Sequence, residues 1–225
     1  MERREQQLEE VMYGKSLLSP HSKQFTTKVL TLATRAREIR TAPLNNVAHL
    51  IDGEWLHESW IRLKKGAAHG IDMVSTDEYA SNLDANINAL LTKLKQGSYK
   101  PQPVKRVYIP KGKDGRRPLG LPTTEDKLAQ RAVSIALSAV YEQEFLDMSY
   151  GFRSRRSAHQ AVSDVKRVIA TGKISWIVDA DIKSFFDTMD HKWLMKFVAH
   201  RIADRKILSL ISKWLKAGVM EDGKL

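Results

Sequence analysis

Residues 174–187 read ISWIVDADIKSFFD, and this stretch is the most informative in the chain. Its first part, Ile174 to Val178, is a continuous apolar run of strand length, which predicts a strand buried on both faces. Asp179 and Asp181 follow, and their side chains point to the same side if the strand continues through both. Such a strand presents carboxylates to a divalent cation, because it fixes the backbone while the side chains stay free to coordinate.

Two other interpretations of this stretch remain open. The acids could simply end a strand and cap a helix, and the stretch alone supports this about as well as a metal site. An apolar strand ending in D-x-D also resembles the opening of haloacid-dehalogenase phosphatases, whose first Asp is a phosphoryl-accepting nucleophile. Ile182 and Lys183 lack the small residues usual after that motif, and roughly 170 residues precede a motif that normally opens its domain. We rank the phosphatase interpretation low.

A basic cluster lies upstream, with seven cations and one acid between Lys100 and Gly120. Residues 105–111 alternate polar and apolar positions and residues 116–122 return after Gly-Lys-Asp-Gly, which predicts a β-hairpin. The turn places Lys111 and Arg117 on facing strands, where they can converge on a phosphate-rich ligand. A solvated hairpin tip is the alternative, and for any single lysine it is the favoured one.

A second basic stretch, residues 150–156, interleaves Tyr150 and Phe152 with arginines. Such a pattern suits a groove that holds a nucleic-acid backbone and stacked bases, although it also fits core aromatics beside surface charges. The residues that we predict to contact nucleic acid are Lys105, Arg106, Lys113, Arg116, Arg155 and Arg156.

The rest of the chain is predominantly helical in pattern. Capping residues predict the starts of several helices, namely Ser75, Thr123 or Thr124, Asp190 and Asp204, and a further helix is expected to begin at Ser157. We expect helices over 2–14, 22–40, 54–65, 75–97, 124–145, 157–170, 190–201 and 204–218.

Composition bounds the function classes. The 225 residues carry a formal net charge of +11, which suits a polyanionic partner but also a merely basic ribosomal or tRNA-handling factor. There is no cysteine, so disulfides and thiolate metal sites are excluded. No apolar run approaches the roughly 20 residues that span a bilayer, and the N-terminus is not a signal peptide. We expect no membrane partner and a cytoplasmic, nucleic-acid-associated protein.

Four segments in a fixed order resemble one family. KKGAAHGIDMVSTDEYASNL, IPKGKDGRRPLGLPTTEDKLAQRAV (109–133), SYGFRSRRSAHQAV (149–162) and VDADIKSFFDTMDH (178–191) are similar to motifs of group II intron reverse transcriptases of bacteria. The ordered set is far more specific than any single member. Two departures are local: Ser154-Arg155 replaces the usual Pro-Gly, and Met73 stands where a Gly is common.

The resemblance implies an α+β right-hand polymerase with an incomplete antiparallel palm sheet. It divides the chain into a helical extension (1–45), fingers (46–145) and the start of a palm (146–225). Asp181 would be the first catalytic carboxylate and a metal ligand, with the backbone carbonyl of Ile182 beside it. Two Mg²⁺ ions are expected in the complete enzyme.

The resemblance also implies nucleotide-binding residues. Phe186 would pack under the incoming sugar and disfavour a 2′-hydroxyl, while Lys111 and Arg117 would hold the triphosphate. Arg153 would line the template or nucleotide pocket. Asp187 and His191 match the motif but are expected to be structural.

The implied function is RNA-directed DNA synthesis, with an RNA template or intron RNA, a DNA or RNA primer and dNTPs as partners. In this family, a YADD hairpin supplies further carboxylates, and this sequence contains no adjacent pair of aspartates. We therefore expect a truncated chain that is inactive alone, unless a separate C-terminal palm and thumb polypeptide completes it. The alternative function is a maturase-like RNA-binding module without catalysis.

Overall fold

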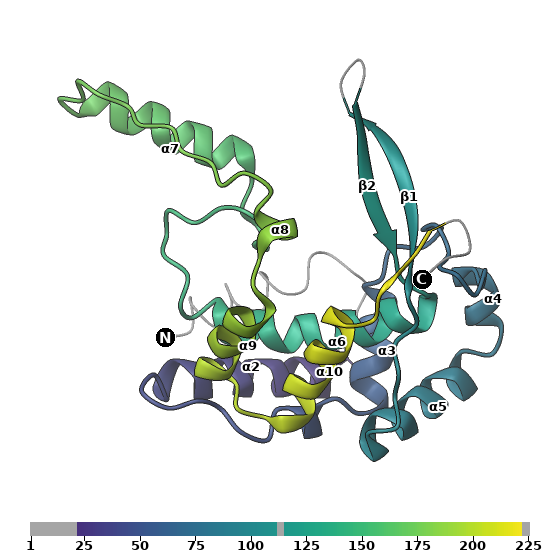
Figure 1. Cartoon of the computed structure of the whole chain (residues 1–225). Coiled ribbons are helices and arrows are strands. Elements are labelled where there is room, and N and C mark those ends of the chain that lie inside the picture. The colour runs from purple at the N-terminus through teal and green to yellow at the C-terminus, as the bar shows by residue number, and fades with distance from the viewer. Residues whose placement is uncertain (1–21, 112–114, 222–225) are drawn as a thin grey trace.

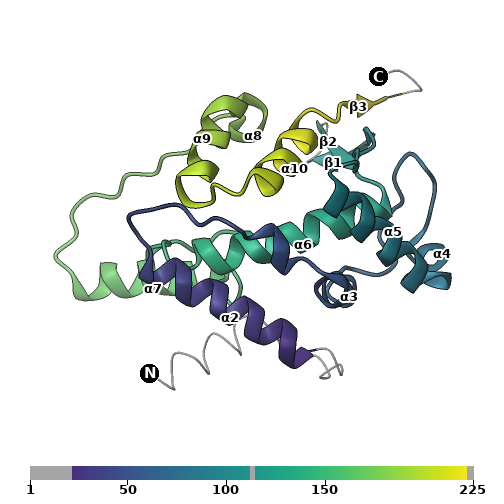
Figure 2. The ribbon, with the colours of Figure 1, turned by 90° about the horizontal axis from the view of Figure 1, so that it is seen from below.

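The computed structural model describes residues 22–111 and 115–221. The helix expected over 2–14, the centre of the hairpin turn and Lys113 lie outside the described residues. Helix α2 (Ser22–Glu38), helix α3 (Gly53–Ile61) and helix α6 (Thr124–Tyr141) form the centre of the core. Figure 2 shows α6 in the middle, with α2 on one side of it and α10 (Arg205–Leu215) on the other.

Contacts of an aromatic side chain join the three central helices. Trp55 is fully buried, meets Phe25 edge to face at 4.9 Å and donates its indole N–H to the Ala132 carbonyl at 3.0 Å. The same core cluster extends from Phe25 to Leu210. It draws residues from all three sequence ranges that we predicted as domains, so these ranges share one core, and the domain boundaries stay a prediction.

The predicted helix starts agree with the capping geometry. Thr123 accepts from the Asp126 amide at 3.1 Å, Ser157 and Gln160 form a capping box at α7 (Ala158–Thr171), and Asp190 caps α9 (His191–Arg201). Asp204 likewise caps α10. The predicted ends are less accurate: α3 ends at Ile61, α6 at Tyr141 and α10 at Leu215.

The single helix predicted over 75–97 is wrong. Ser75 caps α4 (Thr76–Ser81), but Asn82 leaves helical geometry and α5 (Leu83–Gln96) starts afresh. The side chains of Ser81 and Asn86 donate to the carbonyls of Glu78 and Tyr79 at 2.7 and 2.9 Å. Polar side chains thus take over carbonyls that backbone amides of a continuous helix would use.

The described sheet has three strands in the order β2-β1-β3. Strands β1 (Val104–Lys111) and β2 (Gly115–Leu121) form the predicted hairpin, which stands out from the helical body in Figure 1. Strand β3 (Val219–Met220) pairs with the base of β1 in parallel. The short segment before α3 contains a 3₁₀ turn at Ala48–Leu50.

The buried strand predicted over residues 174–178 is a second wrong prediction. These residues form no strand and are exposed, with Trp176 and Val178 each 89% accessible. The described residues therefore contain no antiparallel palm sheet. An apolar run becomes a strand only where neighbouring strands take its backbone hydrogen bonds, and the described part of the chain offers it none.

The segment from α7 to the short helix α8 (Phe185–Thr188) projects away from the body on the same side as the hairpin (Figure 1). Helix α9 returns the chain to the core through Arg201, whose guanidinium donates to the Ala36 and Ile39 carbonyls at 2.7 and 2.8 Å and pairs with Glu144 at 2.8 Å. Among the described helices, none has the length and apolar character needed to cross a membrane.

Candidate catalytic and nucleic-acid site

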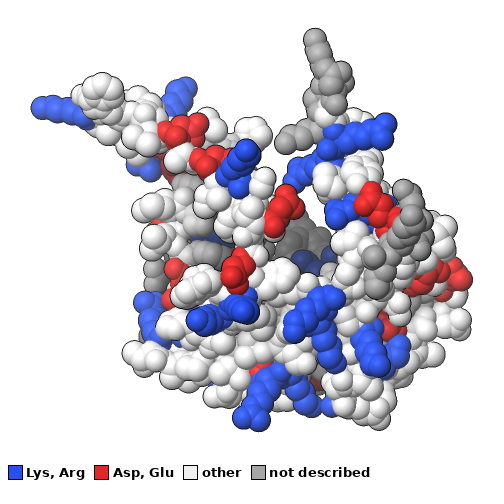
Figure 3. All heavy atoms as spheres, viewed as in Figure 1, with Lys and Arg blue, Asp and Glu red and all other residues white. Residues whose placement is uncertain are grey.

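The hairpin arranges its cations by strand register. Ile109 lies opposite Arg117, Pro110 opposite Arg116, and Lys111 opposite Gly115. Lys111 and Arg117 are therefore on facing strands, two register positions apart, as predicted. Arg116 and Arg117 are exposed, and Figure 3 shows basic residues gathered around the hairpin.

Directly paired residues of an antiparallel ladder share a face, and successive residues alternate. Lys105 and Arg117 consequently lie on one face of the hairpin, and Arg106 and Arg116 lie on the other. Lys105 approaches the Met73 sulfur at 3.6 Å, which links the hairpin base to the preceding loop. The hairpin can thus contact phosphates on two sides, which fits a strand of nucleic acid better than a single small anion.

The loop at residues 66–74 packs against the start of α6. Thr124 donates its hydroxyl to the Val74 carbonyl at 2.8 Å, and Lys127 donates to the Ala68 carbonyl. Gly70 lies so close that an added Cβ would be 2.6 Å from the Thr123 nitrogen. The glycine of this motif is therefore required by a close approach of two backbones at the hairpin base.

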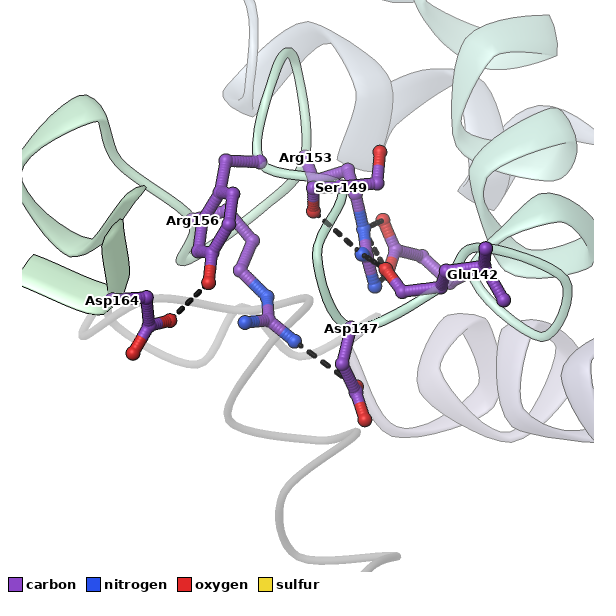
Figure 4. Close-up of polar contacts among 8 residues, drawn as sticks. Glu142, Asp147, Ser149, Arg153, Arg156 and Asp164 are labelled. Carbon is purple, nitrogen blue, oxygen red and sulfur yellow. Dashed lines mark hydrogen bonds and ion pairs between the residues drawn. The ribbon is translucent and has the colours of Figure 1, made fainter. Parts of the chain in front are cut away.

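Arg153 lies in a dense polar network rather than at an open surface, with a side chain only 7% exposed (Figure 4). Its guanidinium pairs with Glu142 at 3.0 Å and donates to the Leu146 and Ser149 carbonyls, each at 2.8 Å. The ring of Phe145 lies 5.0 Å from the guanidinium carbon. Arg153 therefore stabilises the turn that follows α6. Its contact with template or nucleotide stays a prediction.

Beside this network, Arg156 contacts Asp147 at 3.4 Å and lies over the Tyr150 ring at 5.4 Å. Tyr150 donates its hydroxyl to Asp164, which also pairs with Arg167 at 3.1 Å. The hydrogen bond to Asp164 raises the pKa of Tyr150, and the same bond followed by that from Arg167 lowers the pKa of Asp164. These contacts fasten the basic segment to α7, and they leave the predicted binding by Arg155 and Arg156 as a prediction.

The segment with Asp181 is open to solvent throughout. Asp181 is exposed, Ile182 is 65% exposed and Phe186 is 69% exposed. Phe186 meets Phe185 edge to face at 5.3 Å and Phe152 at 6.4 Å. The contact with Phe152 brings the basic segment and the aspartate segment together, two stretches that the sequence treats as separate motifs.

The described residues do not complete a metal site. No group of three or more His, Cys, Asp or Glu side chains lies close enough to hold an ion within residues 22–111 and 115–221. Hard divalent cations take six or more oxygen ligands, and Asp181 with one carbonyl provides too few. Asp181 and the Ile182 carbonyl therefore do not fit resident magnesium without further ligands.

Two contacts of this region were not predicted. Glu142 follows the end of α6 and is 11 positions from Arg153, and no helix or strand continues between the two residues that could have revealed the pair. The Tyr99 hydroxyl donates to Asp126 and accepts from the Trp214 indole at 2.9 Å, which joins the hairpin base to α6 and α10. The polar residue Asp126 within an apolar helical face was the available signal for this second network.

Comparison with known proteins identifies the family. Residues 109–224 match the family described as reverse transcriptase (RNA-dependent DNA polymerase). The chain is 37% identical to protein YkfC of Escherichia coli over 199 residues, which cover 85% of this chain and 52% of that protein. It is also 45% identical over 140 residues to the group II intron-encoded protein LtrA of Lactococcus lactis, covering 62% of this chain and 23% of LtrA.

A third relative is a putative COX1/OXI3 intron 1 protein of Saccharomyces cerevisiae, 31% identical over 136 residues, which cover 60% of this chain and 16% of that protein. The chain thus spans about half the length of YkfC and less of the intron-encoded relatives. The family match covers the end of β1, all of β2, the basic segment, the aspartate segment and α9 to α10. The chain belongs to the reverse transcriptase family and, within it, to the group II intron-like reverse transcriptases and maturases.

Proposed function

We propose that this chain contributes to RNA-directed DNA synthesis by metal-dependent nucleotidyl transfer. The observation that carries the proposal is the contact between Phe152 and Phe186, which joins the basic segment to the segment with Asp181. Together with the cationic hairpin, these segments provide a carboxylate, aromatic surfaces and phosphate-binding groups. Nucleotidyl transfer needs these three elements, because its catalysis rests on positioning and charge stabilisation.

The proposed roles follow the sequence motifs. Asp181 contributes a carboxylate ligand, and the Ile182 carbonyl lies next to it in the chain. Phe186 limits the space under the sugar of the incoming dNTP, and its exposure leaves its ring available for that contact. Lys111 and Arg117 bind the triphosphate from the hairpin, while Arg153 shapes the segment that faces the template.

We propose Mg²⁺ as the cofactor, held only when further carboxylates join Asp181. When bound, such ions would stabilise the charge that develops on the transferred phosphoryl group. No two aspartates are adjacent within the 225 residues, so the remaining ligands have to come from elsewhere. Either a longer form of the chain or a separate polypeptide can supply them. An RNA template or intron RNA and a DNA or RNA primer complete the proposed set of partners.

The exposed apolar segment at residues 174–178 supports the proposal that strands from a longer chain or a separate polypeptide complete the palm. Four of its five residues are Ile174, Trp176, Ile177 and Val178, and these are between 47% and 89% exposed. The neighbouring helix α7 also exposes Val162, Val165, Val168 and Ile169. Added strands would pair with the segment and cover both apolar surfaces, which removes the cost of leaving them in water.

The test is primer extension on an RNA template with Mg²⁺ and dNTPs. The chain is assayed alone and then mixed with a polypeptide that carries the remaining palm carboxylates of a relative. We expect extension only in the mixture and a loss of at least about a thousand-fold with Asp181→Asn, since one ligand of a catalytic ion is removed. Asp179→Asn, two residues away and also exposed, is the matched control and should retain activity.

An RNA-binding module without catalysis is the second candidate, favoured by the cations on both faces of the hairpin. Under this alternative, neutralising Asp181 leaves RNA binding unchanged or strengthens it, because an acid near a phosphate backbone is removed. Absence of extension in every mixture, with salt-sensitive RNA binding intact, would decide for the module and against the polymerase.

A further inference from the structure

A hollow of about 680 Å³ is lined by residues outside the proposed catalytic segment. Its walls are the loop at residues 45–51, the end of α5 and the start of α10. A smaller hollow of about 140 Å³ continues along α10, and the two share Leu94, Arg205, Lys206 and Leu210. We call this continuous depression the α5–α10 seam.

The seam is held open by a fixed backbone frame. Asp204 accepts from the Ala48 amide at 2.8 Å with one carboxylate oxygen and from the Lys206 amide at 2.9 Å with the other. Leu44 donates its amide to the Arg201 carbonyl at 2.8 Å and accepts from the Ala203 amide at 3.0 Å. Because these bonds tie the loop to α10, the hollow exists without rearrangement, which favours ligand binding.

Four cations line the seam: Lys95, Arg205, Lys206 and Lys213. Lys206 donates to the Lys95 carbonyl at 3.0 Å, and Lys213 donates to the Tyr99 carbonyl at 2.7 Å. Neutral carbonyls thus hold these side chains in place without neutralising them. Among the described residues, none of the four cations forms an ion pair, whereas Lys93 on the same helix α5 pairs with Glu125 at 2.9 Å.

Acidic residues in the lining of the seam also do not balance its positive charge. Asp204 is the one acid that lines either hollow in the described residues, it is 9% exposed, and its two oxygens accept backbone N–H groups. Lys95, Arg205 and Lys206 are exposed at the rim, with His49 and Asn46 across the hollow. Cations concentrated in a concave surface repel one another until a polyanion binds and releases their counterions.

The distribution of charge separates this surface from the hairpin. Figure 3 shows basic residues gathered over α5 and α10 on the body of the molecule, apart from those around the hairpin. We infer that the α5–α10 seam is a second nucleic-acid site, which binds the phosphodiester backbone of an RNA that also contacts the hairpin. The choice of RNA as the polyanion rests on the proposed function. The cations contact successive phosphates, and the rim residues His49 and Asn46 supply hydrogen bonds to the same backbone.

The test is fluorescence anisotropy with a labelled RNA hairpin of about 30 nucleotides, measured with the 225-residue chain at several salt concentrations. The seam variant combines Lys95→Gln, Arg205→Gln and Lys206→Gln. The matched control combines Lys23→Gln, Arg37→Gln and Arg40→Gln, three exposed cations in or directly after α2, none of which lines the seam. Both variants lose three charges, so a nonspecific effect of net charge is equal in the two. Arg205→Gln alone is a milder variant, since no described hydrogen bond depends on that side chain.

We expect the seam variant to bind RNA on the order of ten-fold more weakly and to lower the salt slope by about 2, while the control stays within about two-fold of the unaltered chain. Equal losses in both variants, or no loss in the seam variant, would overturn the proposal. Primer extension tests the polymerase proposal and RNA anisotropy tests the seam, so the two proposals can fail separately.

Discussion

Arg153 and Glu142 form an ion pair at 3.0 Å, in which the side chains are 7% and 19% exposed. The same guanidinium donates to two carbonyls of the turn that follows α6. The conformation of the basic segment at residues 150–156 therefore depends on an acid outside it. When one partner of such a buried ion pair is removed, the other charge stays buried without a counter-charge, and this destabilises the fold.

Glu142→Gln removes the negative charge but keeps the size of the side chain. We expect the free energy of unfolding to fall by about 2 kcal/mol, since a nearly buried guanidinium loses its counter-charge. Urea denaturation measures the change, and hydrogen exchange of the 146–153 amides reports whether the turn loosens.

Asp147→Asn is the matched control from the same turn. Asp147 is fully exposed and lies 3.4 Å from Arg156, so its neutralisation should leave the free energy of unfolding nearly unchanged, because water screens the pair. Equal effects of the two substitutions would contradict the structural role that we assign to Glu142.

Met73 and Arg155 both have positive φ, at 60° and 58°. At each position the related motifs commonly carry glycine, which the sequence comparison treats as a small local departure. The structure gives the departure a physical meaning, because a residue with a Cβ is strained in left-handed geometry.

Met73→Gly should raise the free energy of unfolding by about 1 kcal/mol, because the strain at φ 60° is relieved. The corresponding melting temperature should rise by about 2–4 °C for a chain of this size. Met73→Ala removes the same thioether but retains the Cβ, so it should give no such gain. A gain with Ala equal to that with Gly would show that the side chain, and not the backbone geometry, is unfavourable.

The sequence predicted the elements whose signals are local. Ser157, Asp190 and Asp204 cap helices because an N-cap acts on amides two or three residues away. The hairpin followed from alternation and the Gly-Lys-Asp-Gly turn signal. Lys111 and Arg117 are consequently on facing strands, in agreement with the prediction.

The failures concern features that depend on distant residues. The run at 174–178 has the composition of a buried strand, but composition cannot supply the neighbouring strands that its backbone needs. The break at Asn82 depends on which carbonyls the side chains of Ser81 and Asn86 reach. The Arg153 network and the α5–α10 seam join segments with no common periodicity, so they emerge only in three dimensions.

Gly70 provides a further test of the hairpin base. A Cβ at this position would lie 2.6 Å from the nitrogen and 2.7 Å from the Cα of Thr123, and both atoms are backbone. Gly70→Ala should therefore lower the free energy of unfolding by about 2–3 kcal/mol, since the loop must move away from α6. Gly53→Ala is the control, because nothing lies within 4 Å of its added Cβ and the position is helical. Thermal denaturation of the two variants compares them directly, and equal stabilities would contradict the close approach.

Tyr99 and Tyr79 allow the buried hydroxyls to be tested by pH. Burial raises the pKa of both phenols above 10.0, and for Tyr99 the hydrogen bond to Asp126 adds to the effect. When folding raises the pKa of a phenol, the group stabilises the folded state, and this contribution is complete at any pH below the unfolded pKa. The contribution is lost as the pH rises from the unfolded pKa through the folded pKa. The protein should therefore lose stability above about pH 10, and replacing either tyrosine with Phe should make this loss less steep.

At pH 7 the same two substitutions should differ. Tyr99→Phe leaves the Trp214 indole without its acceptor and the buried Asp126 without one donor, so we expect a loss of about 2–3 kcal/mol. The Tyr79 hydroxyl is buried without a hydrogen-bond partner in the described residues, so Tyr79→Phe should be neutral or slightly stabilising. Urea denaturation at pH 7 and at about pH 10.5 separates the two effects. No loss with Tyr99→Phe would mean that the hydrogen bonds from Trp214 and to Asp126 do not hold the hairpin base to α6 and α10. A large loss at pH 7 with Tyr79→Phe would contradict the unpartnered state of the Tyr79 hydroxyl.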